Sequence, residues 1–138
     1  VVDTPPTIDV SLLNVLTAAN ELLIPVIPHP LAVRGTEQLA RLFYQIASKE
    51  NPSLLLKGLV PVMAELTETR HRDVIAQLKR RFGDERILRP VRNDKSICDA
   101  FAEGTTVREY APRSRGAMDF HLLKEEINTS YVIPRRMC

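Results

Sequence analysis

The chain has 138 residues, of which 44% are hydrophobic and 26% are charged, the composition of a globular protein with enough residues for a core. Its formal net charge is only +2, so any nucleic-acid surface has to be a local patch. The two cysteines, Cys98 and Cys138, exclude a disulfide-rich scaffold and a cysteine-based zinc site. No apolar run reaches the roughly 18 residues that a transmembrane helix needs.

Short apolar runs alternate with amphipathic stretches along the chain. The apolar runs predict strands over Glu21–Ile27, Leu54–Met63 and Arg86–Val91. Apolar residues at helical spacing predict helices over Asp9–Ala19, Thr36–Lys49, Thr69–Phe82, Asp94–Ala102 and Arg115–Ile127. This alternation predicts an α/β fold, a parallel sheet with helices on both faces, whose ligands lie beyond the carboxyl ends of the strands. We expect one domain over residues 1–127 and an irregular tail over residues 128–138.

The first three residues, Val1 to Asp3, have the pattern of the last residues of a buried strand. This start fits a processed chain with a short first strand, or a fragment whose preceding strands are missing. We expect the fragment, and therefore a sheet that is incomplete at its N-terminal side. An incomplete sheet has an open edge, which favours self-association.

Two groups of residues are candidates for chemistry. A carboxylate after a parallel strand, as at Asp3, can hold the water shell of Mg²⁺ beside a nucleotide phosphate, but it can equally be a turn former. Basic residues gather at Arg70 and Arg72, and again at Arg92 and Lys95. Such residues can bind phosphates without reading sequence, or simply form a solvated face.

Four sequence blocks together resemble the ParA family of plasmid and chromosome partition ATPases, which belong to the deviant Walker class of P-loop proteins. They are VVDTPP (residues 1–6), LIPVI (residues 23–27), GTEQL (residues 35–39) and YAPRSRGA (residues 110–117). The resemblance extends from Val1 to about Ile127 and corresponds to the C-terminal half of such a domain. It implies a P-loop NTPase-like sheet.

The resemblance also implies a function and a set of residues. The full-length parent would bind ATP and Mg²⁺, form a homodimer and bind DNA nonspecifically. A ParB-like partner would stimulate hydrolysis at the nucleoid, in a bacterial cytoplasm and away from membranes. Asp3 would hold Mg²⁺ through water, and Met63, Pro90 and Arg92 would complete the nucleotide site with it. Arg70, Arg72, Arg92 and Lys95 would bind DNA.

The sequence departs from the family at one decisive place. A phosphate loop needs consecutive glycines with a lysine and a hydroxyl, whereas the five glycines of this sequence are all isolated. We therefore expect no catalytic residue in this chain and no ATP hydrolysis by the chain alone. A non-enzymatic, ParA-derived module that binds DNA or a partner is the alternative. A MinD-like membrane protein fits less well, because Pro134 and few apolar residues follow Ile127.

Overall fold

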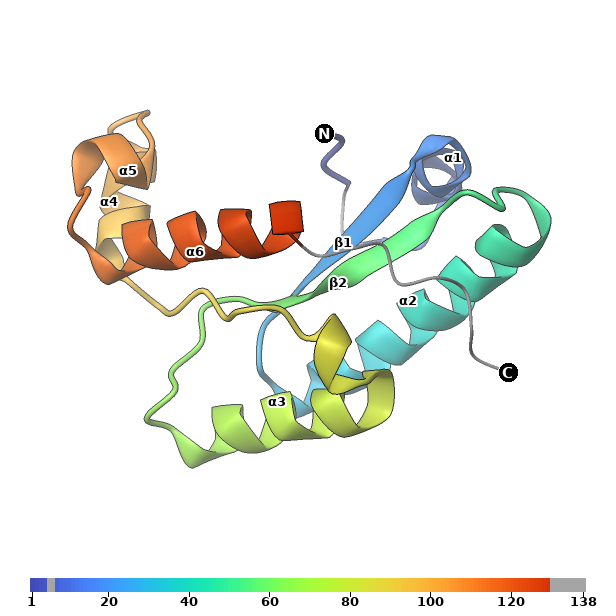
Figure 1. Ribbon diagram of the computed structural model, residues 1–138, viewed down its shortest axis with the longest axis horizontal. Coiled ribbons are helices and arrows are strands. Elements are labelled where there is room, and N and C mark those ends of the chain that lie inside the picture. Colours follow the sequence, from blue (N-terminus) through green and yellow to red (C-terminus); the bar gives the residue numbers. More distant parts are fainter. Residues whose placement is uncertain (5–6, 130–138) are drawn as a thin grey trace.

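A computed structural model describes residues 1–4 and 7–129. Its helices and strands, in chain order, are α1 (Val10–Ala18), β1 (Glu21–Val26), α2 (Pro30–Lys49), β2 (Leu55–Pro61), α3 (Thr69–Phe82), a 3₁₀ turn (Asp84–Arg86), α4 (Lys95–Ala102), α5 (Val107–Tyr110) and α6 (Arg115–Thr129). Strand and helix alternate through the first half, whereas the second half is helical (Figure 1). Residues 130–138, most of the predicted irregular tail, lie outside the described residues.

The two strands pair in parallel, which confirms the predicted α/β class. Their register joins Glu21 to Leu55 and Val26 to Pro61, with an irregularity after Leu22. Because parallel neighbours need a crossover connection, the chain passes through α2 between them.

The predicted third strand, Arg86–Val91, is only partly correct. Residues 87–92, here called the third segment, lie parallel to β2. One isolated bridge joins Leu59 of β2 to Ile87, and a second joins Ala64, after β2, to Arg92. The N–H groups of Leu88 and Val91 also donate to the carbonyls of Leu59 and Pro61. The 3₁₀ turn occupies Arg86, and Pro90 has no N–H for a ladder. A continuous strand therefore does not form.

Helices cover the sheet on both faces, as expected. Successive residues of a strand point to opposite faces, and Leu59 and Val60 of β2 are buried in different clusters. Leu59 packs with residues of α2 and α3, whereas Val60 packs with Leu123 of α6. Figure 1 shows α2 and α3 on one side of the two strands and α6 on the other. A further cluster joins α1 to the later turns of α2.

The two edges of this sheet differ. At the third segment, the Arg89 N–H points away from β2 and donates to Glu126 Oε2 of α6 at 2.8 Å, and Pro90 has no N–H to offer. At β1, the carbonyl of Val26 accepts from the Val62 N–H at 2.9 Å. The backbone groups of Leu23 and Pro25 alternate with those of Val26 and so face away from β2. We call this side of β1 the open edge; within the described residues no strand covers it.

Two expectations about element starts are wrong. Val1 to Asp3 form no strand; Val1 and Val2 are exposed and pair with no strand in the described part of the chain. Helix α2 begins at Pro30 rather than Thr36, because His29 caps it and proline suits the first helical position. The Thr36 hydroxyl instead donates to the Ala32 carbonyl inside the helix, 2.8 Å away.

Candidate functional site

The loop after β2 lies at the carboxyl end of the sheet, where ligands bind in folds of this class. It begins near Met63, which was predicted as a nucleotide contact. Met63 is 53% exposed and has a φ of 52°, the only positive φ at a non-glycine residue within the described ranges. A methionine in this region of φ is uncommon and persists only where its surroundings hold it.

Backbone hydrogen bonds from the third segment hold this loop. The Ala64 N–H donates to the Val91 carbonyl at 3.1 Å, and the Asn93 N–H donates to the Ala64 carbonyl at 3.2 Å. Ala64 itself is 1% exposed. The backbone on the C-terminal side of Met63 is thereby fixed while its side chain reaches solvent.

Side chains that the sequence did not single out also hold the loop. The Glu65 N–H donates to His71 Nδ1 of α3 at 2.9 Å, and the Glu65 carboxylate accepts from Asn93 Nδ2 at 2.9 Å. Because Nδ1 accepts, Nε2 of the neutral ring carries the hydrogen, 3.5 Å from a Glu68 carboxylate oxygen. No spacing in the sequence signals these contacts, because they join separate elements.

Arg92, predicted for both nucleotide and DNA binding, lies against α6. Its Nε and a terminal nitrogen each donate to a different oxygen of Asp119 at 2.8 Å, and its backbone N–H donates to the same carboxylate at 3.0 Å. The side chain of Asp119 is 7% exposed and that of Arg92 is 35% exposed. Asp119 was not predicted, and the guanidinium of Arg92 is largely committed to it.

This pairing shifts both pKa values. Burial acts to raise the pKa of Asp119, but hydrogen bonds from the Arg92 side chain and backbone outweigh it and lower that pKa from 3.8. The same side-chain bond to Asp119 raises the pKa of Arg92. Both groups therefore stay charged at neutral pH.

A shallow groove of about 490 Å³ brings two other predicted residues together. Pro90 of the third segment and Arg72 of α3 both line it, along with Lys79 and Arg89. Its floor is apolar, formed by residues such as Ile87 and Leu88, and its lining includes Glu126 as well as the three cations.

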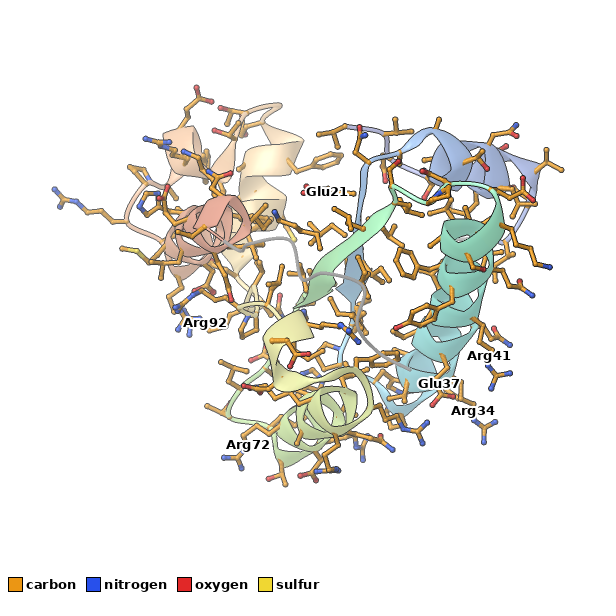
Figure 2. All side chains as sticks on the ribbon, turned by 45° about the vertical axis from the view of Figure 1, so that its right-hand side comes forward. Glu21, Arg34, Glu37, Arg41, Arg72 and Arg92 are labelled. Carbon is orange, nitrogen blue, oxygen red and sulfur yellow. The ribbon has the colours of Figure 1, made fainter. Side chains whose placement is uncertain are left out.

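The remaining predicted residues are dispersed. Arg70 and Lys95 are exposed at the starts of α3 and α4. Asp3 is exposed and makes no hydrogen bond or ion pair with another described residue. Figure 2 shows Arg72 and Arg92 on one side of the view, away from Arg34 and Arg41 of α2. In the described part of the chain, no three acidic, histidine or cysteine side chains cluster as a metal site would require.

Most of this chain is similar to proteins of known families. A family model described as an AAA domain matches residues 1–56. The chromosome-partitioning ATPase Soj of Thermus thermophilus is 29% identical over 125 residues, which are 91% of this chain and 50% of that protein. The sporulation initiation inhibitor Soj of Bacillus subtilis is 27% identical, covering 92% of this chain and 50% of its own length.

A solved structure agrees with these relatives. Cobyrinic acid a,c-diamide synthase from Mycobacterium smegmatis, with bound ADP and magnesium, superposes with a TM-score of 0.65. It is 26% identical and covers 91% of this chain and 43% of its own chain. The fold is therefore a partial α/β fold of the P-loop NTPase type.

Within that class, the chain is a relative of the ParA/Soj partition ATPases, and the predicted resemblance is confirmed. It spans about half the length of the curated relatives it matches. Among the described residues, no helix has the length and hydropathy needed to cross a bilayer.

Proposed function

We propose that the chain is the part of a ParA-like partition ATPase that holds the base side of the ATP site and a surface for nonspecific DNA. The observation that supports nucleotide binding is the fixed backbone with positive φ at Met63, near the carboxyl end of β2. The related synthase structure holds ADP and magnesium, which supports a nucleotide site in this fold.

The residues of the proposed nucleotide site have different roles. Met63 presents an exposed apolar side chain, which suits contact with a purine base. Arg92 acts mainly by tying the third segment to Asp119, and so positions Pro90 and the loop beside it. Asp3 supplies a carboxylate for the water shell of Mg²⁺.

The proposed DNA contacts lie at two places, the start of α3 and the start of α4. Arg70 and Arg72 occupy the first turn of α3, where a cation gains nothing from the helix dipole and adds to the positive potential of the N-terminus. Lys95 is exposed at the first residue of α4. These cations suit phosphate contacts that carry no sequence information.

The ATPase proposal is tested on the reading frame upstream of Val1. We expect it to encode a glycine-rich phosphate loop with its lysine. In the longer polypeptide, Asp3→Ala should abolish Mg²⁺-dependent ATP hydrolysis, whereas Glu125→Ala on α6 should leave it unchanged. A frame without that loop would refute the ATPase and leave the non-enzymatic binding module as the function.

DNA binding is tested by fluorescence anisotropy with random-sequence duplexes at several salt concentrations. Arg70→Ala with Arg72→Ala should weaken binding and lower the salt slope by roughly 2, because each phosphate contact contributes about 0.9. The matched control is Arg34→Ala with Arg41→Ala, which removes two exposed arginines from α2. Equal losses in both double variants would show only a general charge effect.

Dimerisation on ATP, stimulation by a ParB-like partner and location at the nucleoid form the rest of the proposal. The names of the Soj relatives support a role in partition. Light scattering of the longer polypeptide with and without ATP tests the homodimer directly.

A further inference from the structure

The groove of about 490 Å³ lies between α3 and the third segment. Four residues of α3 line it at helical spacing, namely Arg72, Ile75, Ala76 and Lys79. Residues three and four positions apart lie on the same face of a helix, so these four form one stripe. The stripe has two apolar side chains in its middle and a cation at each end. Because Ile75 and Ala76 are only half-buried, α3 keeps apolar surface beyond what its packing on the core covers.

The rest of the groove is also largely apolar. Leu88 and Pro90 of the third segment line it, as does Leu66 of the loop after β2, which is 39% exposed. The backbone here offers little to an added strand, because the Arg89 N–H donates to Glu126 and Pro90 has no N–H. An occupant therefore binds through its side chains, as an amphipathic helix does in an apolar groove.

The charges of the lining select the kind of occupant. Of the described residues that line the groove, Arg72, Lys79 and Arg89 are cationic and Glu126 is acidic. The Glu126 carboxylate already accepts the Arg89 N–H at 2.8 Å. Lys79 lies 2.7 Å from Asp84, but both side chains of this ion pair are well exposed, so the pair contributes little and can be exchanged. The lining therefore suits a partner with carboxylates.

Arg72 and Lys79 also define a spacing between those carboxylates. They are seven positions apart on α3, which is two helical turns or about 10 Å along the axis. A second helix lying alongside presents side chains at the same separation if they too are seven positions apart. The Arg72 guanidinium donates to the Thr69 hydroxyl at 3.2 Å and has further N–H groups for a carboxylate.

We propose that this groove is a docking site for an acidic amphipathic helix of a partner protein. Its apolar face would lie on Ile75 and Leu88, and two of its carboxylates would pair with Arg72 and Lys79. Nucleic acid fits the cations but not the floor, because phosphates are contacted by cationic and polar groups. Residues 130–138 fit less well, since they contain two arginines and no acidic residue. Because Arg72 is also a proposed DNA contact, a bound helix would compete with DNA there.

The probe is a synthetic helix with leucines along one face and two glutamates seven positions apart, followed by fluorescence anisotropy with the full chain. It should bind, and a peptide of equal charge with serines in place of the leucines should bind about tenfold more weakly or worse. Arg72→Glu with Lys79→Glu should weaken binding of the leucine peptide about tenfold or more, because like charges then meet. A leucine peptide with lysines in place of the glutamates should restore binding to this double variant.

The matched control is Arg41→Glu with Arg80→Glu, which makes the same change in net charge at two exposed arginines outside the groove and should change little. Circular dichroism establishes first that each variant is folded, and the serine peptide tests the floor on the unaltered chain. Equal binding of the leucine and serine peptides, or equal losses in the two double variants, would show only general charge attraction and overturn the proposal.

Three further results would also overturn it. One is the absence of peptide binding to the unaltered chain. Another is binding that appears only after residues 130–138 are removed, which would make that segment the occupant. The third is random-sequence duplex DNA that depends on Arg72 and Lys79 for binding but does not displace the peptide, which would assign these cations to nucleic acid.

Discussion

Arg92 and Asp119 join the third segment to α6 through three hydrogen bonds to one carboxylate. Two come from the guanidinium and one from the backbone of the same arginine, so the pair fixes both the side chain and the main chain. Asp94 makes a similar link nearby, because its carboxylate caps α4 at Ser96 and accepts the Gly116 N–H at 2.7 Å. Together these two aspartates position α6 on the sheet.

Asp119→Ala should lower the free energy of unfolding by about 2 kcal/mol, because it removes a carboxylate that accepts three bonds and leaves Arg92 partly buried without its partner. Urea unfolding measures this. The control is Glu125→Ala, which breaks an exposed ion pair with Lys124 and should cost less than about 0.5 kcal/mol. Equal stability of the two variants would contradict a structural role for Asp119.

The pH dependence of stability should follow the same groups. The Gly116 N–H is the main cause of a lowered pKa at Asp94, and Arg92 holds the pKa of Asp119 below 3.8 despite burial. For a lowered pKa, the stabilisation is complete above the unfolded value and is lost as pH falls through the folded value. The free energy of unfolding should therefore decrease below about pH 4. In Asp119→Asn this decrease should be shallower; an unchanged acid limb in urea titrations would count against the assignment.

We expect the stability of the chain to depend on Asn51, which links α1 to the turn before β2. It is 7% exposed, and its Nδ2 donates to the carbonyls of Leu16 and Ala19 at 3.0 and 2.7 Å. Asn51→Asp keeps the shape but replaces both donors by an acceptor. We expect a loss of about 2–3 kcal/mol at neutral pH, since two carbonyls lose their partner and face a carboxylate.

That loss should shrink at low pH, where the aspartic acid carries a proton that can donate. Denaturant unfolding of Asn51→Asp at neutral and acidic pH, each compared with the unaltered chain, measures the difference. An equal loss in free energy of unfolding at both pH values would indicate that Asn51 acts through packing and not through its hydrogen bonds.

Two glycine substitutions should act in opposite directions. Gly116→Ala places a Cβ 2.7 Å from Cγ1 of Ile97 and should destabilise the chain by about 1–2 kcal/mol. Gly35→Ala meets nothing and should stabilise it by about 0.5–1 kcal/mol, because alanine favours the helix. Thermal unfolding of both variants checks the sign. A loss of stability in Gly35→Ala would contradict the open space found around a Cβ at this position.

Local signals predicted much of the fold. The helix over Thr69–Phe82 has the predicted bounds, since its apolar spacing and the following Gly83 mark it clearly. Strand β1 ends one residue before the predicted Ile27. Helix α5 was missed although Thr106 and Glu109 form a capping box, because four residues contain too little apolar pattern to be noticed.

Long-range contacts could not be predicted from the sequence. The third apolar run looked like a strand, but its backbone bonds depend on Pro90 and on Glu126, which lies 37 positions after Arg89. The sequence singled out Arg92 for nucleotide and DNA binding, which remains a prediction. Its bond to Asp119 was not predicted, because the two residues are 27 positions apart and show no spacing signal. The assignments of Asp3, Met63, Pro90, Arg70, Arg72 and Lys95 to ligands remain predictions.

The bond between Arg89 and Glu126 also bears on solubility. A fibril of stacked sheets grows only if every added unit presents a fresh strand edge to the next. When two molecules meet at β1, the outer edge of each is the third segment. There the Arg89 N–H is already bonded to Glu126, and Pro90 has no N–H. For the described residues, we therefore expect edge-to-edge association to stop at a pair of molecules joined at β1, which disfavours growth into a fibril.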